Sequence, residues 1–317
     1  MSAAPHILTF TGNLLAERTQ EFAAWAPART QRAERESFQV GGKGINVSKM
    51  LNRLGAPNTA LCFAGGAAGA ECETWLRARN FGFRAFPNGA ATRTGLVVRG
   101  GGYAETTFLG RDVPPDLAAL RACAEFLLAQ PSGTVLAVSG SLPGWESPDF
   151  DVLREVFHRW PERGSLVVDT YGAPLAWFAN EAAALIRINR AEFETLVPPD
   201  DLKLSTRELL LKLRDRFRAL RWAVTDGGAP VWFMGDHNAP EFFAAPRIRE
   251  VSPTGSGDVM LACLLHARFD RGLSWRDALA WSIPYATANA AHPGIAEFPE
   301  PVTKSAEDST PPFHIDA

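Results

Sequence analysis

A run of small residues that ends in a carboxylate, Thr254-Gly255-Ser256-Gly257-Asp258, comes directly before an apolar stretch with helical spacing. Small residues at a helix start leave the first N–H groups open, and the helix dipole adds partial positive charge there. Such a start stabilises a bound anion, for example a phosphate group. Asp258 would lie beside that anion in the first helical turn, where a carboxylate is also a common capping residue. The run indicates phosphate chemistry and leaves plain capping open.

A second glycine-rich turn, Gly41-Gly42-Lys43-Gly44, opens a stretch whose apolar residues also have helical spacing. The glycines let the backbone approach a ligand closely, and Lys43 and Asn46 add a cation and an amide at the helix start. The turn lacks the spacing and the hydroxyl residue of the phosphate loop G-x-x-x-x-G-K-[ST], and it does not match G-x-G-x-x-G. The turn therefore predicts a small polar ligand bound at a helix start, by a motif that is neither the phosphate loop nor G-x-G-x-x-G.

The elements that position these turns alternate between short apolar runs and amphipathic segments. We expect strands over 134–140, 165–171, 184–189 and 221–227. We expect helices over 149–160, 207–220 and 258–269, where apolar residues recur at three and four. This alternation is typical of βαβ units, so it predicts an α/β fold with a mostly parallel sheet flanked by helices on both faces.

Two stretches depart from that alternation. Segments at about 11–40 and at 92–110 carry alternating polar and apolar residues with glycine turns, which favours strands half exposed to solvent. They predict a small β lid over the main sheet, within a single domain over residues 1–303. Residues 304–317 mix polar residues with few apolar anchors, so we expect a flexible C-terminal tail.

Composition favours a globular protein with a small-molecule partner. The 317 residues are 46% hydrophobic, with a formal net charge of -3 and no long block of like charge, so we expect neither a nucleic-acid nor a membrane partner. No stretch approaches the roughly 20 apolar residues of a membrane span, and the start lacks the features of a signal peptide. The four cysteines are scattered and predict reduced, buried thiols. We expect a cytoplasmic protein.

Both glycine-rich segments resemble the two signatures of the ribokinase-like, or PfkB, carbohydrate kinases, and the resemblance follows the order of nearly the whole chain. Further matches are the S-G-S-L-P run from Ser139 and the N-x-x-E motif at Asn189 and Glu192. The resemblance implies ATP-dependent phosphoryl transfer to a sugar hydroxyl, with Mg²⁺ as the metal cofactor. It also implies a ribokinase-like fold with a small β lid, which could pair in a homodimer.

The resemblance assigns three groups of residues. The catalytic group is the base Asp258 and the anion hole of Gly255, Ser256 and Gly257. The group expected to bind the acceptor comprises Asn13, Glu17, Gly41, Gly42, Lys43, Asn46, Arg93 and Ser139. The group expected on the nucleotide side comprises Asn189, Glu192, Thr225, Gly227 and Asn289, and Asn189 and Glu192 would hold Mg²⁺ largely through water.

The spelling G-K-G-I-N-V resembles the hexose-phosphate kinases of the 1-phosphofructokinase and tagatose-6-phosphate kinase branch. Lys43 and Arg93 would bind the acceptor's phosphate, although Arg93 could also be a solvated lid residue. The sequence departs from the branch at Glu17, where an aspartate is usual, and at Arg187, where a lysine is usual. A kinase for an unphosphorylated sugar or a nucleoside, and a non-catalytic sugar-phosphate sensor, therefore stay open as alternatives.

Overall fold

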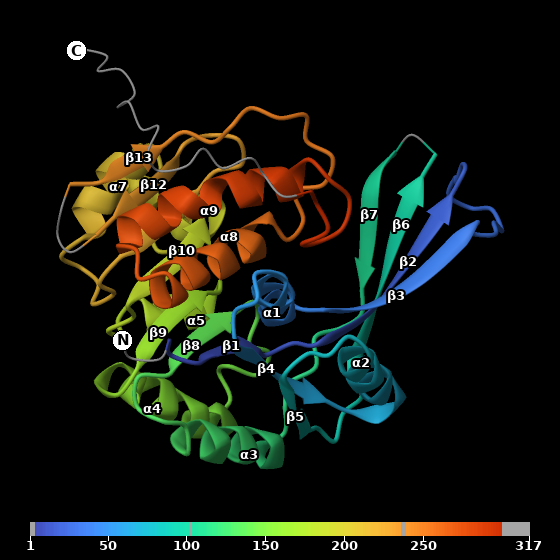
Figure 1. The fold of residues 1–317 in the computed structure, drawn as a ribbon, viewed down its shortest axis with the longest axis horizontal. Helices are drawn as coiled ribbons and strands as arrows, with labels where there is room; N and C mark the ends of the chain where they lie inside the picture. The colour runs from blue at the N-terminus through green and yellow to red at the C-terminus, as the bar shows by residue number, and fades with distance from the viewer. Residues whose placement is uncertain (1–3, 102, 236–238, 300–317) are drawn as a thin grey trace.

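The computed structural model describes residues 4–101, 103–235 and 239–299, and it contains two sheets with helices packed around the larger one (Figure 1). The expected tail over 304–317 lies outside the described residues. Within the described part of the chain, no helix has both the length and the apolar character needed to cross a membrane.

The larger sheet has nine strands in the order β13-β12-β11-β10-β9-β8-β1-β4-β5. All neighbours from β11 to β5 pair in parallel, whereas β12 and β13 join one edge as antiparallel strands. The strands are β1 (Ile7–Thr11), β4 (Asn58–Ala64), β5 (Phe83–Pro87), β8 (Val135–Ser139), β9 (Ser165–Asp169), β10 (Leu185–Asn189), β11 (Trp222–Thr225), β12 (Val231–Met234) and β13 (Glu241–Phe243).

Helices cover both faces of this sheet because its strands alternate between two apolar cores. On β8, Leu136 and Val138 belong to one core, and Val135 and Ala137 belong to the other. The first core is closed by α3 (Leu117–Leu128), α4 (Asp151–Arg159), α5 (Ala173–Phe178), α6 (Arg190–Glu194) and α7 (Thr206–Leu213). The second is closed by α1 (Lys43–Arg53), α8 (Ser256–Leu265) and α9 (Trp275–Ala290). Helix α2 (Gly66–Ala78) packs on a third core beside β4.

The smaller sheet projects from the body and has the strand order β3-β2-β6-β7 (Figure 1). Its strands are β2 (Leu15–Phe22), β3 (Arg35–Gly41), β6 (Arg93–Gly100) and β7 (Tyr103–Leu109). Strand β6 pairs in parallel with β2 and antiparallel with β7. These strands lie in the two stretches where the sequence predicts half-exposed strands.

Two helices differ from the sequence-based boundaries. The helix expected over 207–220 ends at Leu213, because the following chain turns to donate backbone hydrogen bonds from Arg218 and Ala219 to Ala179. The helix expected over 258–269 becomes a π turn at His266–Asp270. Short 3-10 turns occur at Pro148–Phe150, Trp160–Glu162 and Pro199–Asp201.

Five parallel strands of the larger sheet end at polar residues on the same edge. The last residues of β1, β8, β9, β10 and β11 are Thr11, Ser139, Asp169, Asn189 and Thr225. Ligands of open α/β sheets bind outside this carboxyl edge. The fold therefore brings segments that are far apart in the sequence to one candidate site.

Candidate active site

A cavity of about 610 Å³ lies at this edge and is lined by residues of both sheets and of the start of α8. Most of the residues predicted from the sequence line it: Glu17, Gly41, Gly42, Lys43, Asn46, Arg93, Asn189, Thr225, Gly227, Gly255, Ser256, Gly257 and Asp258. The remaining predicted residues do not line it: Asn13, Ser139, Glu192 and Asn289.

The start of α8 presents free backbone donors to the cavity. Gly255 is the N-cap and has φ 75°, a left-handed conformation that glycine adopts without strain. Ser256 N donates to Pro253 O at 3.2 Å, whereas the N–H groups of Gly255, Gly257 and Asp258 have no acceptor within the described chain. These groups sit at the positive end of the helix dipole, so this helix start is suited to an anion.

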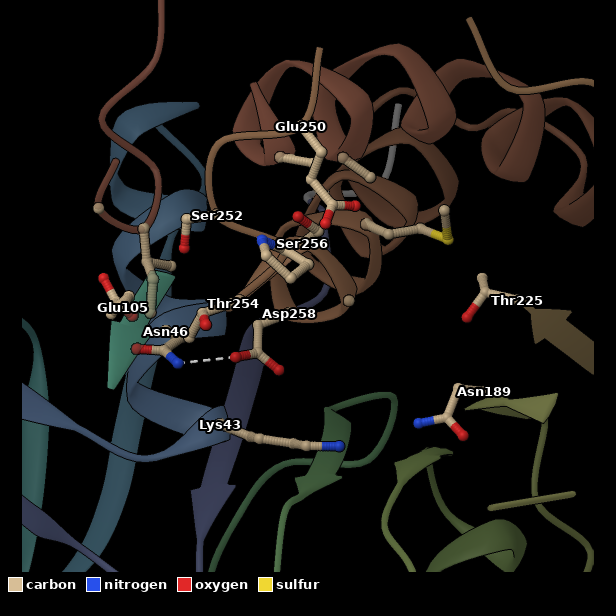
Figure 2. Close-up of a pocket in the computed structure, with 18 of the residues that line it drawn as sticks. Lys43, Asn46, Glu105, Asn189, Thr225, Glu250, Ser252, Thr254, Ser256 and Asp258 are labelled. Atoms are coloured by element: carbon tan, nitrogen blue, oxygen red, sulfur yellow. Dashed lines mark hydrogen bonds between the residues drawn. The ribbon is translucent and has the colours of Figure 1, made fainter. Parts of the chain in front are cut away.

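Asp258 is buried beside these donors and accepts a hydrogen bond from Asn46 Nδ2 at 2.7 Å (Figure 2). The pKa of the Asp258 carboxyl is raised to about 7, chiefly by burial; the charge of Lys43 and the bond from Asn46 act to lower it, and the charge of Asp169 acts to raise it. A carboxylate with a pKa near neutral is matched to accepting a proton at physiological pH. The two glycine-rich turns thus meet at one acidic group.

Two cations share a buried carboxylate next to Asp258. Asp169 is fully buried and accepts hydrogen bonds from Lys43 Nζ at 2.8 Å and from Arg187 Nη1 at 2.9 Å. Arg187 also donates to Thr225 Oγ1 at 3.0 Å. Burial alone would raise the pKa of Asp169, but the ammonium and guanidinium charges hold it below its usual range. Asp169 is therefore ionised and holds both cations in place, and Lys43 also lies 3.4 Å from Glu192 Oε1.

Arg187 lies against the anion-binding turn itself. A Cβ atom on Gly257 would clash with the Arg187 guanidinium, so glycine is required for this close approach. A guanidinium beside the positive end of a helix is unfavourable unless negative charge lies between them. This arrangement favours a multiply charged anion, such as a phosphoryl group, over a neutral ligand.

The nucleotide-side motif forms a reciprocal cap at the start of α6. Asn189 accepts a hydrogen bond from Glu192 N at 2.8 Å, and Glu192 Oε2 accepts one from Asn189 N at 2.9 Å. The other carboxylate oxygen of Glu192 lies 3.4 Å from Lys43 Nζ. No cluster of three or more acidic, His or Cys side chains suited to a metal occurs among the described residues. The oxygen donors of Asn189 and Glu192 fit Mg²⁺ bound through water better than direct ligation.

Two residues predicted to bind ligands, Asn289 and Ser139, do not line the cavity. Asn289 is fully buried, donates to Thr254 O at 3.1 Å and accepts from Ala296 N at 2.9 Å, so it supports the anion-binding turn from behind. Ser139 is also buried, and its hydroxyl has no partner in the described chain. The family resemblance assigned both residues, and it carries no information on whether their side chains reach the cavity.

One side of the cavity is formed by the smaller sheet. Residues two apart on a strand share a face, and Glu17, Gln39, Arg99 and Glu105 all line the cavity. Glu17 accepts a hydrogen bond from Gln39, and burial raises the pKa of its carboxyl. Arg99 and Glu105 form an ion pair at 2.6 Å. Gln39, Arg99 and Glu105 were not among the cavity residues predicted from the sequence. The alternation of polar and apolar residues along a half-buried strand is the signal that could have indicated them.

Arg93 and Asn13 meet at a residue that the sequence did not indicate. Asp112 Oδ1 accepts hydrogen bonds from Asn13 Nδ2 at 2.8 Å and from Arg93 Nη1 at 2.9 Å. Lys43 contacts Asp169 and Glu192 instead. The two cations expected to bind one acceptor phosphate therefore have separate partners in this structure.

Comparison with known proteins decides the family. Residues 12–301 match the model of the pfkB family carbohydrate kinases. The chain belongs to this family. The resemblance inferred from the two glycine-rich motifs is thereby confirmed.

Two curated pfkB-type relatives extend over most of the chain. A 1-phosphofructokinase of Borreliella burgdorferi is 28% identical over 272 residues, covering 83% of this chain and 84% of that protein. A tagatose-6-phosphate kinase of Staphylococcus epidermidis is 28% identical over 283 residues, covering 84% and 88%. The tetrameric inhibited form of phosphofructokinase-2 from Escherichia coli matches with a TM-score of 0.77 at 22% identity, covering 91% and 94% of the two chains. This structural similarity confirms the predicted ribokinase-like α/β fold.

Proposed function

We propose that this protein transfers the terminal phosphoryl group of ATP to a hydroxyl of a hexose phosphate, as a 1-phosphofructokinase-like or tagatose-6-phosphate-kinase-like enzyme. The observation that carries the proposal is Asp258, a buried carboxyl with a pKa near neutral at the start of α8, beside three free N–H groups and two cations. A non-catalytic sensor would need the cations but would not need the base.

In the proposed reaction, Asp258 accepts the proton of the attacking hydroxyl as the oxygen forms its bond to phosphorus. The bond from that phosphorus to the bridging oxygen breaks, and ADP leaves with the electron pair. Asn46 holds the Asp258 carboxylate through the 2.7 Å bond to Oδ2, which leaves Oδ1 to face the acceptor. Positioning and charge stabilisation supply most of the rate in phosphoryl transfer.

The charge on the transferred group is proposed to lie between the N–H groups of α8 and the side chains of Lys43 and Arg187. Asp169 fixes both cations by accepting from each, so they are in place before the reaction begins. Preorganised donors cost no reorganisation during the reaction. Lys43 is thus assigned to the transferred phosphoryl group rather than to the acceptor's own phosphate.

The family implies ATP as the donor, and Mg²⁺ is the proposed metal. Bound Mg²⁺ would offset negative charge on the nucleotide phosphates. Asn189 and Glu192 would hold it through water, and Lys43 would share the Glu192 carboxylate. Thr225, the last residue of β11, and Gly227, just after that strand, line the cavity at the same edge and are proposed to contact the nucleotide.

The smaller sheet is proposed to act as a lid that excludes water from the acceptor side. Its edge strand β7 exposes Phe108 and Leu109, each 56% accessible, although large apolar side chains at a sheet edge usually gain by being covered. We therefore propose a homodimer in which the lids pair, acting in the cytoplasm where ATP is available. Sedimentation at micromolar concentration should show a dimer that Phe108→Ser weakens.

A second candidate is a kinase for an unphosphorylated sugar or a nucleoside. The pairing of Arg93 with Asp112 favours it, because a neutralised arginine attracts an acceptor phosphate less strongly. Both candidates use the same base and anion-binding turn.

A coupled ADP-release assay separates the two candidates. It compares fructose 1-phosphate, fructose 6-phosphate and tagatose 6-phosphate with free fructose, tagatose, ribose and adenosine, each with Mg-ATP. The proposal expects the best phosphorylated acceptor to exceed every free compound at least tenfold in kcat/KM. A free sugar or nucleoside that wins by tenfold would replace the hexose-phosphate assignment with the second candidate.

A further inference from the structure

Asp112 lies in the irregular segment between β7 and α3 and pairs with Arg93, which lines the cavity. Its side chain is 59% exposed, yet one of its oxygens, Oδ1, accepts hydrogen bonds from two more deeply buried groups. One is Arg93 Nη1 at 2.9 Å and the other is Asn13 Nδ2 at 2.8 Å. Two convergent donors, one of them cationic, form the geometry of an anion site.

The donors depend on this carboxylate more than the carboxylate depends on them. The Arg93 side chain is 12% exposed, so it would lose a partner that water cannot fully replace, whereas Asn13 Nδ2 would keep its bond to Ser141 Oγ at 2.9 Å. Asp112 is largely hydrated and would regain water if it were released. Another anion that reached Arg93 from the cavity could therefore replace Asp112, at the cost of the carboxylate's bonds to Arg93 and Asn13.

The backbone around Asp112 is held on either side but not at Asp112 itself. Gly110 N donates to Thr94 O at 2.8 Å, and Asp116 N donates to Asn88 Oδ1 at 2.8 Å. Between these anchors, no backbone N–H of residues 111–113 donates to an acceptor in the described chain. The segment that carries the Asp112 carboxylate can thus move without breaking any hydrogen bond donated by the backbone N–H groups of residues 111–113.

We infer that Asp112 is a specificity-determining residue: its carboxylate occupies the anion site of Arg93 and Asn13, so a phosphorylated acceptor must displace it. A neutral acceptor has no such competition. This inference rests on the proposed function for the identity of the acceptor. The protein should therefore discriminate between phosphorylated and free sugars less sharply than it would if Arg93 had no competing carboxylate.

The test compares wild type with Asp112→Asn, which removes the negative charge and keeps the side-chain shape. The expected result is a fall in KM for fructose 6-phosphate or fructose 1-phosphate of roughly 5- to 20-fold, the range for losing a competing charge at a partly buried arginine. The KM values for free fructose and for ATP should stay within about twofold. Asp215→Asn, an equal charge change at an exposed residue on another element, should leave all three unchanged.

A double-mutant cycle with Arg93→Gln checks that the effect passes through Arg93, because the gain from Asp112→Asn should then disappear. An unchanged or raised KM for both sugar phosphates in Asp112→Asn would overturn the inference, since a raised value means that Asp112 orients Arg93 for binding. If wild type uses only free sugars while Asp112→Asn gains sugar phosphates, the inference stands and the hexose-phosphate function fails. If neither protein uses a sugar phosphate, both are wrong.

Discussion

Replacement of Asp169 by asparagine perturbs the proposed phosphoryl site without touching the base. Asp169 is fully buried and accepts charge-assisted hydrogen bonds from Lys43 at 2.8 Å and from Arg187 at 2.9 Å. Asparagine has one carbonyl oxygen and no charge, so the two cations would lose their shared counter-charge. Breaking a buried ion pair by removing one partner costs about 3–5 kcal/mol of stability. We expect a clearly lowered Tm in a protein that still folds.

The catalytic effect of Asp169→Asn should have two parts. The misplaced cations should lower kcat by roughly 10²–10³, the range for losing preorganised electrostatic contacts. The charge of Asp169 raises the pKa of Asp258, so its removal should lower that pKa, and the freed ammonium of Lys43 acts in the same direction. Since Asp258 is active when deprotonated, the acid limb of the kcat/KM profile should move to lower pH, by roughly half a unit to one unit.

The assay is a pH series of coupled ADP release between pH 5 and 9, with Tm recorded for each protein. Asp201→Asn is the matched control, because it removes the carboxylate of a surface pair with Lys212 at 2.5 Å. It should leave both kcat and the acid limb in place. A normal kcat with an unmoved acid limb in folded Asp169→Asn would refute the idea that this carboxylate organises the phosphoryl site.

Three further substitutions test separate contacts. Asn46→Ala removes the hydrogen bond that lowers the pKa of Asp258, so the acid limb of the kcat/KM profile should move to higher pH. A pH series in which the acid limb stays in place would contradict this role of Asn46. Gly257→Ala places a methyl group against the Arg187 guanidinium, so kcat should fall by at least roughly tenfold. A wild-type kcat in steady-state kinetics would mean that Arg187 has no role at the anion-binding turn. Ser139→Ala removes a buried hydroxyl without a partner, so the acceptor KM should stay within about twofold; a large rise would restore Ser139 as a ligand.

The sequence predicted those parts of the site that are contiguous in the chain. Gly255 to Asp258 and Gly41 to Lys43 each combine a turn, a helix start and a reactive side chain within a few residues, so local rules are sufficient. The alternation of apolar runs with amphipathic segments predicted the parallel sheet for the same reason.

Contacts that depend on tertiary structure were missed. Asp169 ends an apolar strand, and Asp112 lies in a loop of ordinary composition; neither position indicates which cation it meets. The pairing of Lys43 with Asp169 spans 126 residues, and that of Arg93 with Asp112 joins the first residue of β6 to the segment that follows β7. Asn289 and Ser139 were assigned from the family resemblance, and spacing along the chain does not indicate whether a side chain at the end of a strand or helix reaches the cavity.

The most direct test of the account is the rate of Asp258→Asn. This change removes the base while it keeps the shape of the side chain and its place in the first turn of α8. Quench-flow with Mg-ATP and the best acceptor at pH 7.5 should show phosphoryl transfer slowed by roughly 10²–10⁴, with a nucleotide Kd close to that of wild type. A variant that transfers the phosphoryl group at near the wild-type rate would contradict the central claim that Asp258 is the general base.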